Sequence, residues 1–144
     1  MASSDPLRVL VFQVGDLACG IPAESVREVL PAMPATRIPG AHPVVDGLVN
    51  VRGRILTVID GHRLLNRAPL SGHEGVTIMV DLDGRQYGLR VSDVDDLYDV
   101  APENLDAATE RASVPGRLTE LHGGRQVVLL SIASLLTPVV GAGP

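Results

Sequence analysis

Short stretches of alternating hydrophobic and polar residues recur along the chain. In the clearest one, residues 76–83, every second side chain is apolar: Val76, Ile78, Val80 and Leu82. This period of two predicts a β-strand with one buried face, and it leaves Thr77, Asp81 and Asp83 on the other face. Asp83-Gly84 then predicts a tight hairpin turn, because glycine tolerates the positive φ that such turns require. The inward-facing row continues after the turn at Tyr87, Leu89 and Val91.

Two further runs, 55–59 and 127–132, are apolar almost throughout, which predicts strands buried on both faces. Short helical patterns follow them, at His62–Leu65 and Ala133–Leu136. Asp60 and Ser131 precede these patterns, and their side-chain oxygens can accept the free N–H groups of a first helical turn. Pro138 is expected to end the second helix. Another helical turn, opened by Glu24 or Ser25, would carry Val26, Val29 and Leu30.

The chain also contains an internal repeat. Residues 9–29 align without a gap with residues 77–97, and residues 53–65 align with 124–136 in the same order. Each copy has an apolar run, a turn with a glycine and a second apolar run. Three later positions correspond, pairing Val26 with Val94, Glu28 with Asp96 and Val29 with Leu97. We therefore expect an all-β fold of two similar halves, joined by a polar connector.

Composition narrows the class of protein. The 144 residues fit one domain, and 15 glycines and 11 prolines among β-branched residues favour short strands and many turns. The net charge is −5, and only three residues are aromatic, so nucleic-acid binding is disfavoured. No stretch has the ~20 apolar residues of a membrane span, and the first residues do not form a signal peptide. We expect a cytoplasmic protein.

Motifs for catalysis are absent from the sequence. There is no lysine, no phosphate-binding loop, no HExxH and no G-x-S-x-G, and the four histidines do not have metal-ligand spacing. Cys19, the single cysteine, is expected to be a small core residue. Several aspartates (93, 95, 96 and 99) alternate with apolar residues and are expected to form the solvated face of a half-buried strand. The sequence thus predicts no enzyme activity, no cofactor and no metal site.

The segment from Gly47 to Arg54 is the most distinctive part of the sequence. Asn50 and Arg52 alternate with apolar residues near a strand end, and Gly53 turns the chain before the next apolar run. One interpretation makes Asn50 a turn residue and Arg52 a solvated charge. The other makes both of them parts of a binding surface, and the pattern alone does not decide between the two.

In this segment the sequence resembles the CheW-like family. The family signature, a G-V-I-N-L-R-G type segment and then an apolar strand ending in Asp, is present as Gly47-Leu-Val-Asn-Val-Arg-Gly53 and Val58-Ile-Asp60. Further matches occur, in order, at Gly15-Asp16, Gly20-Ile21-Pro22, Val26-Arg27-Glu28-Val29, Thr36-Arg37-Ile38-Pro39 and Gly88-Leu-Arg-Val-Ser-Asp-Val94. Together they extend from about residue 7 to residue 137.

The resemblance implies a fold of two packed five-stranded SH3-like β-barrels with a few short helices. It implies one CheW-like domain over residues 7–137. Residues 1–66 plus C-terminal elements, and residues 76–137, would form its two barrel subdomains. Flexible termini are expected at 1–6 and 138–144. Members of this family have no activity and no cofactor.

The resemblance also implies two partners, the cytoplasmic tip of a chemoreceptor and the regulatory domain of a CheA-type histidine kinase. Receptor contact is expected at Val26, Glu28, Gly47, Asn50, Val51 and Arg52. In this interpretation Val26 and Val51 are apolar anchors for a receptor helix, and Arg52 binds a carboxylate or carbonyl oxygens. Kinase contact is expected at Ala35 and Thr36. The protein would then be an adaptor associated with receptor arrays.

Some positions depart from the family pattern and leave alternatives open. Asp60 is followed by Gly61-His62-Arg63, where the family often has Asp-Leu-Arg, and the segment 30–35 is rich in proline. One alternative is therefore a variant that binds the receptor but not the kinase. A second is a small hydrolase that uses Cys19 or His62. A third is a generic SH3-like peptide-binding module, against which the scarcity of aromatic residues argues.

Overall fold

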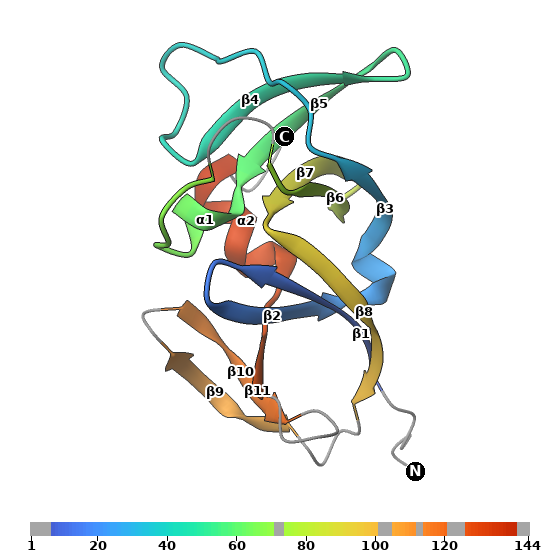
Figure 1. Ribbon diagram of the computed structural model, residues 1–144, viewed down its shortest axis with the longest axis vertical. Helices are drawn as coiled ribbons and strands as arrows, with labels where there is room; N and C mark the ends of the chain where they lie inside the picture. Colours follow the sequence, from blue (N-terminus) through green and yellow to red (C-terminus); the bar gives the residue numbers. More distant parts are fainter. Residues whose placement is uncertain (1–6, 71–73, 101–104, 112–113, 121–125, 141–144) are drawn as a thin grey trace.

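Two β-sheets make up most of the chain in the computed structural model, which describes residues 7–70, 74–100, 105–111, 114–120 and 126–140 (Figure 1). In the first half the elements are β1 (Leu7–Val14), β2 (Leu17–Pro22), the 3₁₀ turn η1 (Ala23–Ser25), β3 (Val26–Pro31), β4 (Val45–Val51), β5 (Arg54–Asp60) and α1 (Gly61–Leu64). In the second half they are β6 (Val76–Leu82), β7 (Arg85–Val91), β8 (Asp93–Val100), β9 (Leu105–Arg111), β10 (Val114–Glu120), β11 (Gln126–Leu129) and α2 (Ile132–Val140).

The two halves of the chain exchange strands. The six-stranded sheet has the order β8-β1-β2-β11-β10-β9, and the five-stranded sheet has the order β3-β6-β7-β5-β4. The hairpin β1–β2 therefore lies in one sheet while the following strand β3 crosses to the other, and β8 crosses back after the hairpin β6–β7. Equivalent pairings recur, since β11 runs parallel to β2 and β5 runs parallel to β7. The internal repeat of the sequence is thus a repeat of structure, with each sheet built from both halves.

A backbone bridge joins the two edges of the five-stranded sheet. Strands β3 and β4 lie at its opposite edges, and Thr36, which follows β3, exchanges two hydrogen bonds of 2.8 Å with Leu48 of β4. Closing a sheet on itself removes exposed edges. Gly47 permits this closure: its φ is +148°, and a Cβ at this position would lie 2.4 Å from the carbonyl oxygen of Thr36.

Buried apolar side chains of the described residues form three clusters. The largest lies between the two sheets and joins side chains of both to helix α2, among them Phe12, Ile21, Ile59, Ile78, Leu89 and Leu136. A second cluster belongs to the six-stranded sheet and contains Val9, Val11, Val100, Val127 and Leu129. The third belongs to the five-stranded sheet and contains Leu30, Val49, Val51, Leu56, Val58 and Met79. Each sheet thus has its own interior, and the larger cluster joins them.

Several local expectations are confirmed. Asp83 and Gly84 form a two-residue turn with φ of 51° and 82°, between the paired residues Leu82 and Arg85. The Asp60 carboxylate accepts hydrogen bonds from the N–H groups of His62 and Arg63 at the start of α1. Ser131 accepts one from Ser134 in α2 (3.3 Å). Of the run 127–132, expected to be a strand buried on both faces, Val127–Leu129 are a buried strand, whereas Ser131 is exposed and Ile132 begins α2.

Other local expectations are wrong. Residues Val26–Pro31 form strand β3 and not a helical turn, because they pair with β6 across the repeat. Thr77 is buried, since the cluster around Met79 covers the second face of β6. Ile55, expected to be buried, is 64% exposed because it follows the β4–β5 turn at the end of the sheet.

The C-terminal end also differs from the expectation. Helix α2 continues through Pro138 to Val140, so residues 138–140 are helical and not part of a flexible tail. The expected turn at Gly123-Gly124 and the expected flexible segments 1–6 and 141–144 lie outside the described residues. Among the described residues, no helix has both the length and the apolar character that crossing a bilayer requires.

Candidate functional site

An ion pair joins strand β3 to the tip of the β4–β5 hairpin. Arg52 binds Glu28 through two contacts, Nη2 to Oε1 at 2.6 Å and Nη1 to Oε2 at 3.2 Å. This two-point geometry is the one a guanidinium makes with a carboxylate. The hydrogen bond from Arg52 holds the pKa of the Glu28 carboxyl below its ordinary value. Both side chains remain accessible to solvent, with exposures of 67% for Arg52 and 37% for Glu28, so the pair can exchange partners at low cost.

The hairpin tip that carries Arg52 is a tight turn. Arg52 and Gly53 have φ of 51° and 85°, and the flanking residues Val51 and Arg54 pair across the turn. The side-chain oxygen of Asn50 accepts a hydrogen bond of 2.8 Å from the Gly53 N–H. Asn50 is therefore a turn residue, as one of the two sequence interpretations predicts. Arg52 is held in a left-handed conformation that non-glycine residues seldom adopt.

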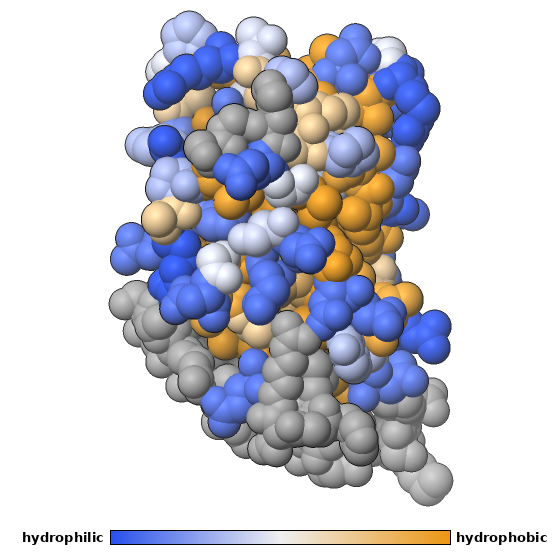
Figure 2. Space-filling view, viewed as in Figure 1, coloured by the Kyte–Doolittle hydropathy of each residue, from blue (hydrophilic) through white to orange (hydrophobic). Residues whose placement is uncertain are grey.

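Apolar surface accompanies this ion pair. Val29 of β3 is 43% exposed, and Val26 is half-buried against the large inter-sheet cluster. Figure 2 shows an apolar area on this side of the molecule, over β3. On the equivalent strand β8, Leu97 is 48% exposed. Val29 is not among the residues that the sequence predicts for the binding surface. The sequence does contain a signal for it, because the internal repeat aligns Val29 with Leu97. The structure shows that both of these apolar side chains are exposed.

The remaining residues predicted from the sequence lie near the Thr36–Leu48 bridge that closes the five-stranded sheet. Val51 is 7% exposed and packs inside the five-stranded sheet. Gly47 contacts the backbone of Thr36, so a residue predicted for the receptor and one predicted for the kinase meet in the closing bridge. Ala35 packs against the interior cluster of the same sheet, while Thr36 is exposed. The structure therefore groups Gly47, Ala35 and Thr36, and it groups Glu28 separately with Arg52.

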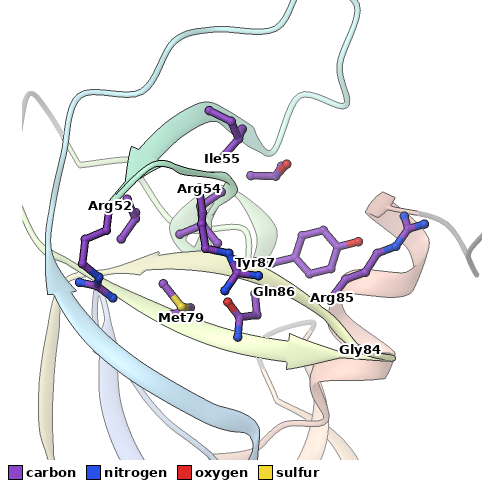
Figure 3. Close-up of a pocket in the computed structure, with 11 residues that line it drawn as sticks. Arg52, Arg54, Ile55, Met79, Gly84, Arg85, Gln86 and Tyr87 are labelled. Atoms are coloured by element: carbon purple, nitrogen blue, oxygen red, sulfur yellow. The ribbon is translucent and has the colours of Figure 1, made fainter.

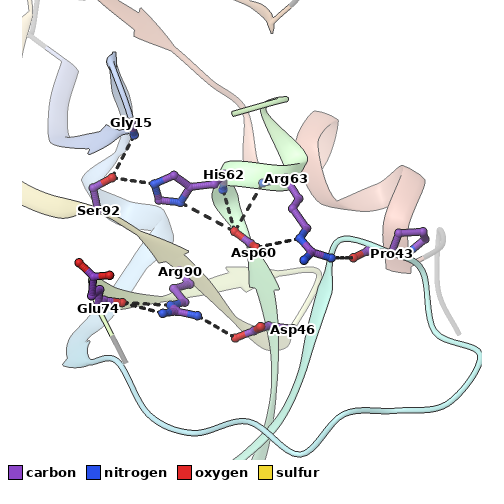
Figure 4. A network of polar contacts seen from close by, with 9 residues as sticks. All are labelled: Gly15, Pro43, Asp46, Asp60, His62, Arg63, Glu74, Arg90 and Ser92. Carbon is purple, nitrogen blue, oxygen red and sulfur yellow. Dashed lines mark hydrogen bonds and ion pairs between the residues drawn. The ribbon is translucent and has the colours of Figure 1, made fainter. Parts of the chain in front are cut away.

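A polar network lies where the two sheets meet (Figure 4). His62 of α1 contacts the Oγ of Ser92 through Nε2 at 2.7 Å, and that Oγ also accepts a hydrogen bond of 3.0 Å from the Gly15 N–H. The network thus joins α1, the β1–β2 turn and the residue between β7 and β8. Nearby, Arg90 donates to the Glu74 carbonyl oxygen (2.9 Å) and pairs with Asp46 (3.5 Å).

This network is not arranged for nucleophilic catalysis. The Nδ1 of His62 lies 3.8 Å from the Asp60 carboxylate, too far for a hydrogen bond, and the carboxylate is already occupied by the N–H groups of α1. Burial lowers the pKa of His62, so the ring favours its neutral form. The Ser92 hydroxyl serves as an acceptor for the backbone of Gly15. The geometry of this network fits a structural role, in which hydrogen bonds connect the two sheets.

Cys19 is equally unsuited to nucleophilic chemistry. The residue is fully buried in the inter-sheet cluster, and burial raises the pKa of its thiol to about 12. A thiol at this pKa stays protonated and unreactive at neutral pH. Within the described ranges, no three His, Cys, Asp or Glu side chains come together as a metal site.

Comparisons of the sequence and of the fold with known proteins give matches to one family. The model of the CheW-like domain matches residues 8–139. The chain is 31% identical over 106 residues to a chemotaxis protein CheW of Rhizobium meliloti, covering 73% of this chain and 68% of that protein. It is 29% identical over 133 residues to a chemotaxis protein CheW of Klebsiella aerogenes, covering 89% and 80%. The crystal structure of the scaffolding protein TtCheW from Thermoanaerobacter tengcongensis has the same fold, with a TM-score of 0.83 at 20% identity over 94% of this chain and 95% of that one.

Proposed function

This chain belongs to the CheW-like family, and from that membership we propose that it couples chemoreceptors to a CheA-type histidine kinase. The family is one of non-catalytic scaffolds. Its relatives are named as chemotaxis proteins, and the structural neighbour is named as a scaffolding protein. A coupling function requires two binding surfaces on one rigid body, and the large shared core between the sheets supplies the rigidity.

The receptor surface that we propose is the exposed side of β3 with the tip of the β4–β5 hairpin. The observation that carries it is the two-point Arg52–Glu28 pair on edge strand β3, the strand that also exposes Val29. A receptor helix can place apolar side chains against Val26 and Val29, while Arg52 turns from Glu28 to an acceptor on the helix. Because the pair is exposed, this exchange does not leave a buried charge without a partner.

The kinase surface that we propose is the segment around Ala35 and Thr36. Thr36 is exposed, and its backbone is fixed by the bridge to Leu48. A fixed segment loses little conformational entropy on binding, which favours recognition. Gly47 allows the backbone of this segment to approach β4, because the absence of a side chain leaves room for the Thr36 carbonyl group. In this account Gly47 contributes to kinase binding indirectly, through the shape of the closure.

Separate calorimetric titrations test the two halves of the proposal. The whole chain is titrated with a cytoplasmic fragment of a chemoreceptor and, in a second experiment, with the regulatory domain of the CheA kinase from the same bacterium. Binding to both partners supports the coupling function. Binding to the receptor fragment alone would establish the receptor-only variant, and binding to neither would overturn the proposal.

A further inference from the structure

An open groove of about 630 Å³ lies between the β4–β5 and β6–β7 hairpins (Figure 3). Its floor is apolar and includes Val51, Leu56 and Met79, which belong to the interior of the five-stranded sheet. Arginines stand around it: Arg52 and Arg85 at opposite ends, and Arg54 in the middle, where it points toward Gln86. The groove therefore combines an apolar base with a cationic margin.

The charge of this groove differs from that of the chain as a whole. The protein carries a net charge of −5, but none of the described residues that line the groove is acidic. Arg52 is paired with Glu28, whereas Arg54 and Arg85 form no ion pair with any described residue. Two unpaired guanidinium groups thus lie beside apolar surface. Ile55, which also lines the groove, is the most exposed of the large apolar residues that the structure describes, at 64%.

We propose that this groove docks an acidic amphipathic segment of a partner protein. Arginine suits carboxylates because its planar guanidinium offers paired N–H donors, and the apolar floor can receive an aliphatic or aromatic side chain placed between the carboxylates. Burial of Ile55 against such a side chain adds hydrophobic stabilisation. Single-stranded nucleic acid is a poorer match, since it favours several stacking rings and Tyr87 is the only aromatic residue in the lining.

The groove adjoins the proposed receptor surface at the tip of the β4–β5 hairpin, but the residues tested here are not among those proposed to contact the receptor or the kinase. Among the described residues, the side chain of Glu28 pairs with Arg52 and not with Arg54 or Arg85. Arg52, which borders both surfaces, is left unchanged in the test. Failure of receptor or kinase binding therefore does not decide whether the groove docks an acidic segment. Equally, loss of the groove function leaves the coupling proposal intact.

Peptide selection tests the groove without assuming a partner. A phage-displayed library of random 12-residue peptides is selected on the intact wild-type chain and counter-selected on the Arg54→Glu/Arg85→Glu double variant. The expected peptides carry two or more Asp or Glu residues around a Leu, Ile or Phe. Enrichment of neutral or basic peptides, or no enrichment at all, would overturn the proposal.

Fluorescence anisotropy then measures the most enriched peptide and a matched peptide in which each Asp or Glu is replaced by Asn or Gln. We expect the acidic peptide to bind wild type at least tenfold more tightly than its neutral match. Arg54→Glu/Arg85→Glu should remove this preference, and Ile55→Ser should weaken binding severalfold. The control variant Arg8→Glu/Arg63→Glu changes the net charge equally but lies outside the groove and outside both proposed binding surfaces, so it should bind as wild type does.

Two results would contradict the docking proposal. One is an equal loss of binding in the control variant, which would mean that net charge alone attracts the peptide. The other is concentration-dependent self-association of the chain in sedimentation experiments that the Arg54→Glu/Arg85→Glu variant abolishes, which would make a second copy the occupant. Thermal unfolding of each variant confirms that it is folded. Should the double variant fail to fold, Ile55→Ser and the neutral peptide still decide the question.

Discussion

Strands β3 and β8 hold equivalent places in the two halves of the chain, but they present different chemistry. Each crosses from its own hairpin to the opposite sheet and becomes an edge strand there. Each exposes one apolar side chain at the equivalent point, Val29 or Leu97. On β3, Glu28 is bound by Arg52, whereas the equivalent Asp96 accepts a hydrogen bond of 2.7 Å from the N–H of Leu97.

The difference has a simple origin in the sequence. In the alignment of the halves Gly53 falls on Gly124, so the position equivalent to Arg52 is Gly123, which has no side chain. The repeated fold therefore supplies two similar edge strands, and only the first half has an arginine at this position of the alignment. Binding chemistry in this architecture is a property of side chains placed on the fold and not of the fold itself.

The largest effect is expected from disrupting the bridge between Thr36 and Leu48, which closes the five-stranded sheet. Gly47→Ala would place a Cβ 2.4 Å from the Thr36 carbonyl oxygen, at a φ of +148° that side chains disfavour. We expect urea unfolding to show a loss of about 3 kcal/mol. Gly53→Ala is the control: its φ is also positive but nothing lies within 4 Å of the added Cβ, so about 1 kcal/mol should be lost. Equal losses in the two variants would show that the closure does not constrain residue 47.

Reversing the charge of Arg52 should make β3 resemble β8. Arg52→Asp places two carboxylates together and removes the donor proposed for the receptor, so its affinity for a receptor fragment should fall about tenfold without loss of folding. Arg8→Asp is the matched control, because Arg8 pairs with Asp99 on the six-stranded sheet with a similar exposure of 66%. A collapsed thermal transition in Arg52→Asp would instead make Arg52 a structural residue.

The exposed apolar residues of the two strands provide a finer comparison. Val29→Ser should lower receptor affinity about fivefold, since it removes exposed apolar area from the strand proposed to contact the receptor. Leu97→Ser removes a comparably exposed side chain from β8 and should leave the affinity within about twofold of wild type. Equal effects in a calorimetric titration would mean that both strands contact the receptor.

The smallest predicted effect concerns His62, which has no counterpart because the equivalent residue is Ala133. Burial and the nearby Arg90 lower its pKa from the ordinary 6.5, while Asp60 acts in the opposite direction. The folded chain therefore binds this proton less readily than the unfolded chain, and stability should decrease as the pH falls below 6.5. His62→Gln should reduce this pH dependence in urea unfolding between pH 7.5 and 5.5. An unchanged slope would exclude His62 as its source.

The sequence predicted the architecture well because its strongest signals are local. Alternation over 76–83, the Asp83-Gly84 turn and the Asp60 cap each depend on neighbouring residues, and the internal repeat extends them to both halves. The expected all-β fold of two packed units is confirmed by the two sheets and by the similarity to TtCheW, although one sheet has six strands where five were expected.

The site was less predictable because its contacts are distant along the chain. Glu28 and Arg52 are separated by 24 positions, and nothing in either segment alone indicates that they meet. The pairing of β3 with β6 likewise depends on strand exchange between halves, so Val26–Pro31 was assigned to a helical turn. Ile55 was expected inside because its run is apolar, but its exposure depends on where the sheet ends. Such features require the assembled fold.

The most direct test of the coupling function is a ternary mixture of the chain, a chemoreceptor fragment and the CheA regulatory domain, analysed by size-exclusion chromatography with light scattering. The separate surfaces proposed around Arg52 and around Thr36 predict a single complex that contains all three proteins. They also predict that Arg52→Asp releases the receptor fragment while the kinase domain stays bound. Two mutually exclusive binary complexes would show that the partners share one surface and would contradict coupling by this chain.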